Sequence, residues 1–363
     1  MHLCFMDIAA AYDAQTPYTM GLGGTQAAVC YLSAALVKAG AQVTLVNQKR
    51  EAGEALGVRQ LTPEALDDDT LQSFSAIIVN GRWTEELVRH LKQRTPTPLW
   101  AWMHEACFQT PYILPLAEFA GFLFVSEWQR HLNAPLVPKP AKSPVISNGI
   151  APPFHTLFLP NEKILSAKSA PTAVYAGSSK RGLLQLPEII PALRAKHPDL
   201  LFEIYNDGVV GTDENENREF REKLLKLEGL SYLGAVSQAE LAARLKRASY
   251  FLSPNTYPET FCIALAEAMA AGCFCIATAR AALPSTAHGF AALMPVPMAD
   301  DPSWQPDSLS AADFSAFATE QITQWQARPA EGREKHLRAQ VDFARTHYDW
   351  GKHAAEWKKF LGC

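Results

Sequence analysis

The sequence predicts an α/β protein built from two doubly wound domains with a cleft between them. The chain has 363 residues, more than one hydrophobic core usually holds. Short apolar runs alternate with helical patterns in both halves, which is typical of parallel sheets whose strands are joined by crossover helices. A proline-rich stretch without periodicity, from Pro135 to Pro153, separates the two series.

The first series predicts five strands and one clear helix. A glycine-rich turn, Gly21 to Gln26, opens a helical pattern that runs from Thr25 to Ala39. The predicted strands are Leu3 to Ile8, Val43 to Val46, Ala76 to Val79, Leu99 to Met103 and Gly121 to Val125.

The second series begins with a strand at Ala173 to Ala176 and continues to a strand at Phe274 to Thr278. We expect the domain junction between about Phe154 and Pro171. From about Ser310 to Cys363 the chain has a charged, helical pattern whose aromatic residues need a surface to cover.

The composition argues against several classes of protein. Hydrophobic residues make up 48% of the chain and charged residues 19%, as in ordinary soluble proteins. The net charge of −4 gives no global basic field, so we predict no nucleic-acid partner, and an anionic ligand would need local cations. No signal-peptide pattern and no apolar run of about 18 to 20 residues is present, which predicts a cytoplasmic protein. Seven scattered cysteines without a C-x2-C pair predict free thiols and no metal site.

The most informative segment is SPNTYPETFCIALAEAMAAG, residues Ser253 to Gly272. An apolar strand enters a proline-containing loop, and a helix is predicted from about Phe261 to Ala271. Backbone N–H groups near Thr260, Phe261 and Cys262 would form a phosphate site at the helix start. Glu259 and Glu267 are eight residues apart. On one helix they would lie on roughly the same side, separated by a rise of about 12 Å, which suits a long polar ligand.

This segment resembles the E-x7-E element of the retaining glycosyltransferases of family 4, which have the two-domain GT-B fold. The flanking segments follow that family's order and extend the resemblance over most of the chain. They are GLGGTQ (Gly21 to Gln26), FVSEWQ (Phe124 to Gln129), ISNGIAPPF (Ile146 to Phe154), YAGSSKRGLLQLPEIIPAL (Tyr175 to Leu193), LFEIYNDG (Leu201 to Gly208) and LSYLGAVSQAELAARLKRASYFLSPN (Leu230 to Asn255).

The resemblance implies an acceptor-binding domain over residues 1–160, a nucleotide-sugar-binding domain over 161–335, and a C-terminal helix over 336–363 that crosses back to the first domain. It also implies sugar transfer with retention from a nucleoside diphosphate sugar, with UDP as the default and no other cofactor. The acceptor would be a glycan, a lipid-linked saccharide or a small molecule.

The resemblance assigns roles to individual residues. Glu259 would hold sugar hydroxyls and Glu267 the ribose, while Gly23 and Gly24 close over the donor phosphates. His104 would lie near the reacting carbon, with Glu105 as a second candidate there. The residues expected to hold the diphosphate are Ser178, Lys180, Arg181, Thr260, Phe261 and Cys262.

The phosphate loop Ser178 to Gly182 departs from the family pattern. It presents two cations and two hydroxyls, and we expect it to open a helix after the Ala173 to Ala176 strand. The loop is shorter than usual. Arg181 stands where the family has a lysine, and Ser178 where it has an arginine, so Lys180 is expected to substitute for that arginine.

Several other features have simpler explanations. Asp67, Asp68 and Asp69 contain a D-x-D pattern but precede a helix, so we interpret them as a solvated cap. Ser126 and Gln129 form a capping-box pattern. Asn148 and Gly149 predict a turn in which the glycine has positive φ. The basic segment Thr84 to Arg94 is expected to be a solvated helix face, with contact to the inner face of a membrane as the alternative.

Three other functions stay open at this point. A sugar phosphorylase or a nucleotide-sugar epimerase would use the same fold. A non-catalytic donor-binding subunit would bind the nucleotide sugar without transferring it.

Overall fold

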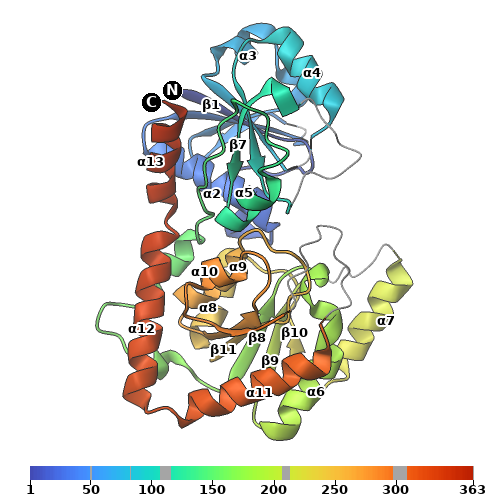
Figure 1. The fold of residues 1–363 in the computed structure, drawn as a ribbon, viewed down its shortest axis with the longest axis vertical. Coiled ribbons are helices and arrows are strands. Elements are labelled where there is room, and N and C mark those ends of the chain that lie inside the picture. Colours follow the sequence, from blue (N-terminus) through green and yellow to red (C-terminus); the bar gives the residue numbers. More distant parts are fainter. Residues whose placement is uncertain (50, 82, 107–115, 207–212, 297–308, 363) are drawn as a thin grey trace. The chain divides into compact units, whose positions relative to one another are not determined.

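A computed structural model describes residues 1–49, 51–81, 83–106, 116–206, 213–296 and 309–362, with only the backbone of Lys180. The chain divides into two compact units (Figure 1). The first consists of Met1–Gly149 and Tyr348–Cys363, and the second of Ile150–His347. The chain therefore passes between the units twice, after Gly149 and after His347.

The first unit contains a seven-stranded sheet in the order β3-β4-β2-β1-β5-β6-β7. All neighbouring strands are parallel except β3 and β4, which form a short antiparallel hairpin. The five predicted strands are confirmed. The hairpin was not predicted, because its two strands are short and largely polar. The strands are β1 (His2–Asp7), β2 (Gln42–Asn47), β3 (Gly53–Ala55), β4 (Val58–Leu61), β5 (Ala76–Asn80), β6 (Leu99–Met103) and β7 (Phe119–Phe124).

Helices pack on this sheet, and the last of them comes from the C-terminus. Trp357 of the C-terminal helix α13 lies with its ring centroid 5.8 Å from that of Phe5 and 5.0 Å from that of Trp102. The predicted return of the last helix to the first domain is confirmed. The helices are α1 (Thr16–Thr19), α2 (Gly24–Lys38), α3 (Asp68–Ser73), α4 (Glu85–Arg94), α5 (Glu127–Asn133) and α13 (Trp350–Leu361).

Gly149 packs against Trp350 of this helix, which gives it a different role from the predicted turn. Gly149 does not have a positive φ. Instead, a Cβ atom at this position would lie 2.7 Å from the Trp350 ring. The glycine is therefore required by close packing rather than by turn geometry.

The second unit contains a six-stranded sheet, parallel throughout, in the order β10-β9-β8-β11-β12-β13. Its strands are β8 (Thr172–Ala176), β9 (Leu201–Tyr205), β10 (Leu230–Tyr232), β11 (Tyr250–Ser253), β12 (Phe274–Thr278) and β13 (Ala292–Met294). Its helices are α6 (Leu186–Lys196), α7 (Glu214–Leu225), α8 (Gln238–Arg247), α9 (Ile263–Ala270), α10 (Leu283–Ala287), α11 (Ala311–Ala327) and α12 (Ala330–His347).

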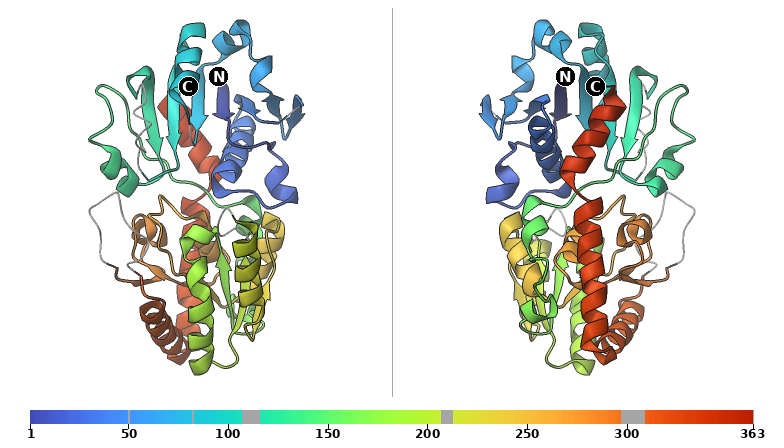
Figure 2. Two further views of the ribbon diagram at one scale, coloured as in Figure 1. Left: turned by 90° about the vertical axis from the view of Figure 1, so that its right-hand side faces the viewer. Right: turned by 90° about the vertical axis from the view of Figure 1, so that its left-hand side faces the viewer.

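The helices α11 and α12, drawn in brown to red in Figure 2, run along the second unit. Apolar residues of both helices belong to its hydrophobic core. The Trp325 ring of α11 stacks on Phe274 at a centroid distance of 4.1 Å. The buried Gln340 of α12 donates from Nε2 to the carbonyl oxygens of Met269 and Cys273, at 3.0 and 2.9 Å. These contacts fix the C-terminal end of α9, the helix that carries Glu267.

Both sheets reverse their strand order at one place. The reversal lies between β1 and β5 in the first unit and between β8 and β11 in the second. In open parallel sheets, ligands bind at the carboxyl ends of the strands at this reversal. A ligand site is therefore expected at the carboxyl ends of the strands in each sheet, beside the reversal.

Candidate functional site

At the carboxyl edge of the second sheet, the loops after β8 and β11 touch. Gly182 follows a 3₁₀ turn, Ser179–Arg181, and has a φ of +97°. A Cβ atom on Gly182 would lie 2.0 Å from the carbonyl oxygen of Pro254, so only glycine permits this approach. A second 3₁₀ turn, Leu183–Gln185, then precedes α6, so the phosphate loop leads into this helix through two 3₁₀ turns.

An ion pair joins the same two loops. The Arg181 guanidinium donates from Nε to Oε1 of Glu259 and from Nη1 to the Ser178 hydroxyl. It also lies over the Tyr257 ring, 5.4 Å from the centroid. Burial disfavours the charged form of Arg181, but the neighbouring Glu259 carboxylate more than offsets this and holds its pKa above the ordinary value. Arg181 is therefore a permanent cation at this edge.

Two buried side chains hold the backbone of the phosphate loop. The Tyr175 hydroxyl donates to the carbonyl oxygen of Ser178 at 2.7 Å, and burial raises the Tyr175 pKa, so the hydroxyl keeps its proton. The Asn206 amide donates to the Gly177 carbonyl oxygen at 2.5 Å. The Lys180 side chain lies outside the described part of the structure, so its predicted role stays a prediction.

The helix that follows Glu259 starts later than predicted. It spans Ile263–Ala270, and Cys262 caps it with a φ of +70°. Glu259 lies in the loop before this helix. The predicted rise of about 12 Å along one helix therefore does not apply to Glu259 and Glu267. Thr260 and Phe261 are buried in this loop, where the Thr286 hydroxyl donates to the Phe261 carbonyl oxygen.

Glu267 lies inside α9 and is 2% exposed. Its Oε1 accepts the backbone N–H of Ala151 at 3.1 Å. Burial raises the pKa of Glu267 to about 8, although the Ala151 hydrogen bond favours the charged form. In this structure Glu267 therefore anchors the backbone with which the second unit begins.

The corresponding edge of the first unit is organised by Asp7, the last residue of β1. Its Oδ2 accepts hydrogen bonds from the Tyr12 hydroxyl at 2.8 Å, the Asn80 amide at 3.0 Å and the Gln26 amide at 3.2 Å. Its Oδ1 accepts the N–H of Ala9 at 3.0 Å. Asp7 is 1% exposed, so this carboxylate is buried and well supplied with donors.

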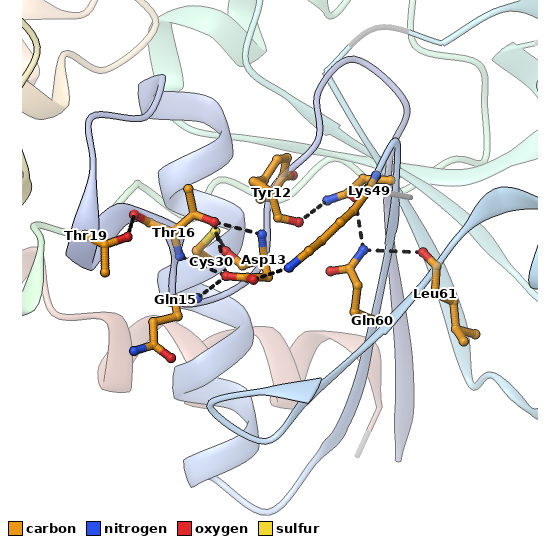
Figure 3. Close-up of polar contacts among 10 residues, drawn as sticks. Tyr12, Asp13, Gln15, Thr16, Thr19, Cys30, Lys49, Gln60 and Leu61 are labelled. Atoms are coloured by element: carbon orange, nitrogen blue, oxygen red, sulfur yellow. Dashed lines mark hydrogen bonds and ion pairs between the residues drawn. The ribbon is translucent and has the colours of Figure 1, made fainter. Parts of the chain in front are cut away.

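The network continues along the edge to β2 and β4 (Figure 3). The Asn47 amide donates to the Tyr12 carbonyl oxygen at 2.8 Å and accepts from the Gln60 amide at 3.0 Å. Lys49 forms an ion pair with Asp13. Burial would raise the Asp13 pKa, but hydrogen bonds from Lys49 and Thr16 outweigh it and lower the pKa. These contacts fix the loop between β1 and α2.

The predicted glycine turn depends on this network. Gly23 is the N-cap of α2, and Gly24 is its first residue. A Cβ atom on Gly23 would lie 2.8 Å from Oε1 of Gln26, whose amide nitrogen is bound to Asp7. Asp7 thus helps to orient the turn that carries both predicted glycines.

His104 directly follows β6, as predicted. Its ring centroid lies 4.6 Å from that of Trp102, and burial lowers the His104 pKa to about 3, so the ring is neutral at physiological pH. Gln129 of α5 holds the adjoining backbone by donating to the carbonyl oxygens of Met103 at 3.2 Å and Glu105 at 2.6 Å.

The same glutamine modifies the predicted capping box. Ser126 accepts the N–H of Gln129 at 3.2 Å, as expected for an N-cap. The Gln129 side chain, however, accepts from the N–H of Val125 at 2.9 Å rather than from Ser126. Only the serine half of the box therefore forms.

The D-x-D pattern is a helix cap, as interpreted from the sequence. Asp67 is the N-cap of α3 and accepts the N–H of Thr70 at 2.7 Å, and all three aspartates are exposed. Among the described residues, no group of three His, Cys, Asp or Glu side chains is arranged to hold a metal ion. Five of the cysteines are free thiols, whereas Cys107 and Cys363 lie outside the described residues.

Sequence reasoning did not single out several residues that build these edges. Asp7, Asn47 and Asn80 each end a buried strand, and this shared polar ending was a usable signal. Tyr257 and the contact between Glu267 and Ala151 gave no such signal, because they depend on tertiary packing. The predicted site residues fall into two groups: Gly23, Gly24, His104 and Glu105 lie in the first unit, and the others lie in the second.

Comparisons with known proteins agree with this architecture. Residues 170–303 match the family model described as Glycosyl transferases group 1. No curated protein matches the sequence. Among the described helices, none combines the length and apolar character needed to cross a bilayer.

Several solved structures share the fold over nearly the whole chain. A glycosyltransferase from Rickettsia africae has a TM-score of 0.70 at 12% identity, covering 99% of this chain and 97% of its own. A sucrose-phosphate synthase from Thermosynechococcus elongatus has a TM-score of 0.68 at 17% identity, covering 99% and 98%. Anabaena HepE, solved in complex with UDP and glucose, has a TM-score of 0.66 at 13% identity, covering 99% of both chains. The chain therefore has the GT-B fold, and its second unit carries a region that matches the group 1 glycosyl transferases.

Proposed function

We propose that this protein is a retaining glycosyltransferase of family 4 that takes its sugar from a nucleoside diphosphate sugar. The observation that carries the proposal is the joining of Arg181, Ser178 and Glu259 beside the start of α9. A permanent cation and a helix N-terminus suit a diphosphate, and a nearby carboxylate suits sugar hydroxyls. The match of residues 170–303 to the group 1 family supports the same reading.

In the proposed complex the donor lies along the carboxyl edge of the second sheet. Arg181, Ser178 and Lys180 hold the diphosphate together with backbone N–H groups near Thr260, Phe261 and Cys262. Glu259 accepts hydrogen bonds from the sugar, and Glu267 from the ribose diol. Uridine is the default base, in keeping with the UDP bound to Anabaena HepE.

The chemistry then depends on charge stabilisation. Negative charge develops on the leaving diphosphate as the glycosidic bond breaks, and Arg181 with the helix start is placed to stabilise it. Because the protein supplies this positive charge, the proposed mechanism requires no metal ion. A leaving phosphate oxygen accepts the acceptor's proton, and transfer on the same face retains the anomeric configuration.

The first unit is proposed to bind the acceptor, a saccharide, a lipid-linked saccharide or a small molecule. Gly23 and Gly24 are proposed to approach the donor phosphates, and His104, neutral because of its lowered pKa, to lie near the reacting carbon, with Glu105 as the alternative. The proposed location is the cytoplasm, with contact to the inner face of the membrane through α4 as the alternative.

A thermal-shift screen tests the donor assignment. Nucleoside diphosphates and their sugars are added to wild type, Glu267→Ala and Glu320→Ala, and each melting temperature is compared with that of the same variant without ligand. Glu320 is a matched control, because it is an exposed glutamate on α11. One nucleotide should stabilise wild type and Glu320→Ala, and stabilise Glu267→Ala less. No response to any nucleotide would refute the proposal.

Product analysis tests the reaction and its alternatives. Transfer to an acceptor, with the donor's anomeric configuration conserved by NMR, is expected. Turnover that requires inorganic phosphate would indicate a phosphorylase, and a changed donor without acceptor an epimerase. Donor binding without transfer or hydrolysis would indicate a non-catalytic subunit.

A further inference from the structure

The contact between Arg181 and Glu259 has a consequence for what the site binds. We propose that this pair makes the site discriminate between a nucleoside diphosphate sugar and the spent nucleoside diphosphate. The proposal rests on the function proposed above, and it assigns to the pair a role in donor selection and product release.

Separating Arg181 from Glu259 has a free-energy cost. The Glu259 side chain is 6% exposed. If a diphosphate takes Arg181 away, this carboxylate is left buried without its cation, which is strongly unfavourable. A ligand that offers only phosphate oxygens to Arg181 therefore binds against this cost.

The sugar of an intact donor can replace Arg181 as the partner of Glu259. A sugar attached to the diphosphate brings hydroxyl donors, and a carboxylate accepts hydrogen bonds from them. The complete donor thus compensates both members of the pair, because its phosphates pair with Arg181 and its sugar with Glu259. The spent nucleotide compensates only Arg181.

Arg181, rather than Glu259, is the member of the pair that can move. Glu259 is fixed through its backbone, whose carbonyl oxygen accepts the N–H of Ala282 at 3.0 Å. The Arg181 side chain is 37% exposed, and it rests on the face of the Tyr257 ring, which can hold a guanidinium in more than one position. The cation can therefore move between the carboxylate and a phosphate while the carboxylate stays in place.

During turnover, this exchange favours release of the spent nucleotide. After the sugar has left, Glu259 loses its hydroxyl donors and competes with the diphosphate for Arg181. Recapture of Arg181 weakens the hold on the product, and product release limits turnover in many enzymes.

Binding measurements on charge-removing variants test the proposal. Isothermal titration calorimetry is performed with UDP and UDP-glucose, or with the nucleotide pair preferred in the thermal screen. Glu259→Gln removes the competing charge but keeps the shape, so UDP should bind about tenfold more tightly than to wild type, while the sugar donor gains nothing. Arg181→Gln should weaken both ligands. The double variant should bind UDP as Arg181→Gln does, because the gain requires a free Arg181.

Two further variants complete the experiment. Glu228→Gln is the matched control, since it breaks a surface pair with Arg194 in the same unit, and it should change neither affinity. If Glu259→Gln does not fold, Glu259→Asp withdraws the carboxylate from Arg181 and should also tighten UDP binding.

The outcomes separate this inference from the proposed function. UDP affinity that is unchanged or lower in both Glu259 variants would overturn the exchange, even though the donor site stands. Failure of wild type to bind any nucleoside diphosphate or its sugar would overturn the proposed function, and the exchange with it.

Discussion

The two sheets reverse their strand order in the same way, yet the strands at the reversal are joined differently in the two units. In the first unit, Asp7 at the end of β1 accepts a hydrogen bond from Asn80 at the end of β5, both buried. In the second, Arg181 after β8 pairs with Glu259 after β11, and the arginine is partly exposed. The first junction is saturated by internal donors, whereas the second can exchange its partners with a ligand.

The backbone shows the same difference. Among the described residues, four non-glycine residues have a positive φ: Leu56 in the first unit, and Cys262, Ala281 and His288 in the second. Cys262 is the N-cap of α9, and Ala281 precedes Ala282, whose N–H donates to the Glu259 carbonyl oxygen. Strained backbone tends to collect at functional sites. This difference supports the proposal that the carboxyl end of the second sheet binds the sugar donor, while the Asp7 network holds the loops of the first unit in place.

The largest expected effect comes from separating the two loops that follow β8 and β11 at the carboxyl end of the second sheet. Gly182→Ala would place a Cβ atom 2.0 Å from the Pro254 carbonyl oxygen, at a φ that alanine disfavours. We expect a loss of about 4 kcal/mol, or about 10 °C in melting temperature, and loss of nucleotide binding. Differential scanning calorimetry with and without UDP measures both.

Gly289→Ala is the matched control. Gly289 also has a positive φ, +81°, but no atom lies within 4 Å of its Cβ position. Gly289→Ala should lower the free energy of unfolding by only about 1 kcal/mol, which is the cost of placing alanine in a left-handed conformation. It should still bind nucleotide. Equal losses in the two variants would mean that the contact between the loops is unimportant.

The second prediction concerns the hydrogen-bond network around Asp7 in the first unit. Asp7→Ala would remove the acceptor shared by the Tyr12, Gln26 and Asn80 side chains and leave buried donors without it. We expect a loss of about 3 kcal/mol. Asp67→Ala, at an exposed helix cap, should cost much less, because water can replace its side chain. Similar melting temperatures for the two variants would show that the buried network does not stabilise the first unit.

Much of this comparison could be predicted from the sequence. The alternation of apolar runs and helical patterns placed the five strands of the first series, because periodicity reports burial directly. The return of the C-terminal helix was predicted from the family resemblance and not from periodicity. The pairing of Arg181 with Glu259 could not be foreseen, since 78 residues separate them and only the strand order brings them together. The late start of α9 at Ile263 was also missed, because Cys262 adopts a left-handed conformation that cysteine rarely takes.

The third prediction concerns how protein stability depends on the ionisation of Glu267. Burial raises the pKa of Glu267 to about 8, so the folded protein keeps a proton that the unfolded chain releases above its ordinary pKa of about 4.3. The contribution of Glu267 to the free energy of unfolding therefore falls as the pH rises to about 8, and it then levels off. Glu267→Gln does not titrate and can still accept the Ala151 N–H.

The expected result is a pH-dependent difference between the two proteins. From pH 5.5 to pH 8.5, the melting temperature of wild type should fall relative to Glu267→Gln by about 5 °C. Glu320→Gln, on the exposed face of α11, should follow wild type at every pH. Parallel curves for wild type and Glu267→Gln would show that the Glu267 pKa is not raised.

The smallest expected effect concerns the strain beside Glu259. Ala281 has a φ of +53°, a conformation that costs alanine about 1 kcal/mol but costs glycine little. Ala281→Gly relieves this strain and loses part of the gain to the greater freedom of the unfolded chain, so we expect about 0.5 kcal/mol of stabilisation. Its neighbour Ala282 has a φ of −83°, so Ala282→Gly carries the entropy cost without the relief and should destabilise by a similar amount. Opposite signs at two adjacent alanines would show that the loop holding Glu259 is strained. If both variants are destabilised equally, the second edge is no more strained than the first.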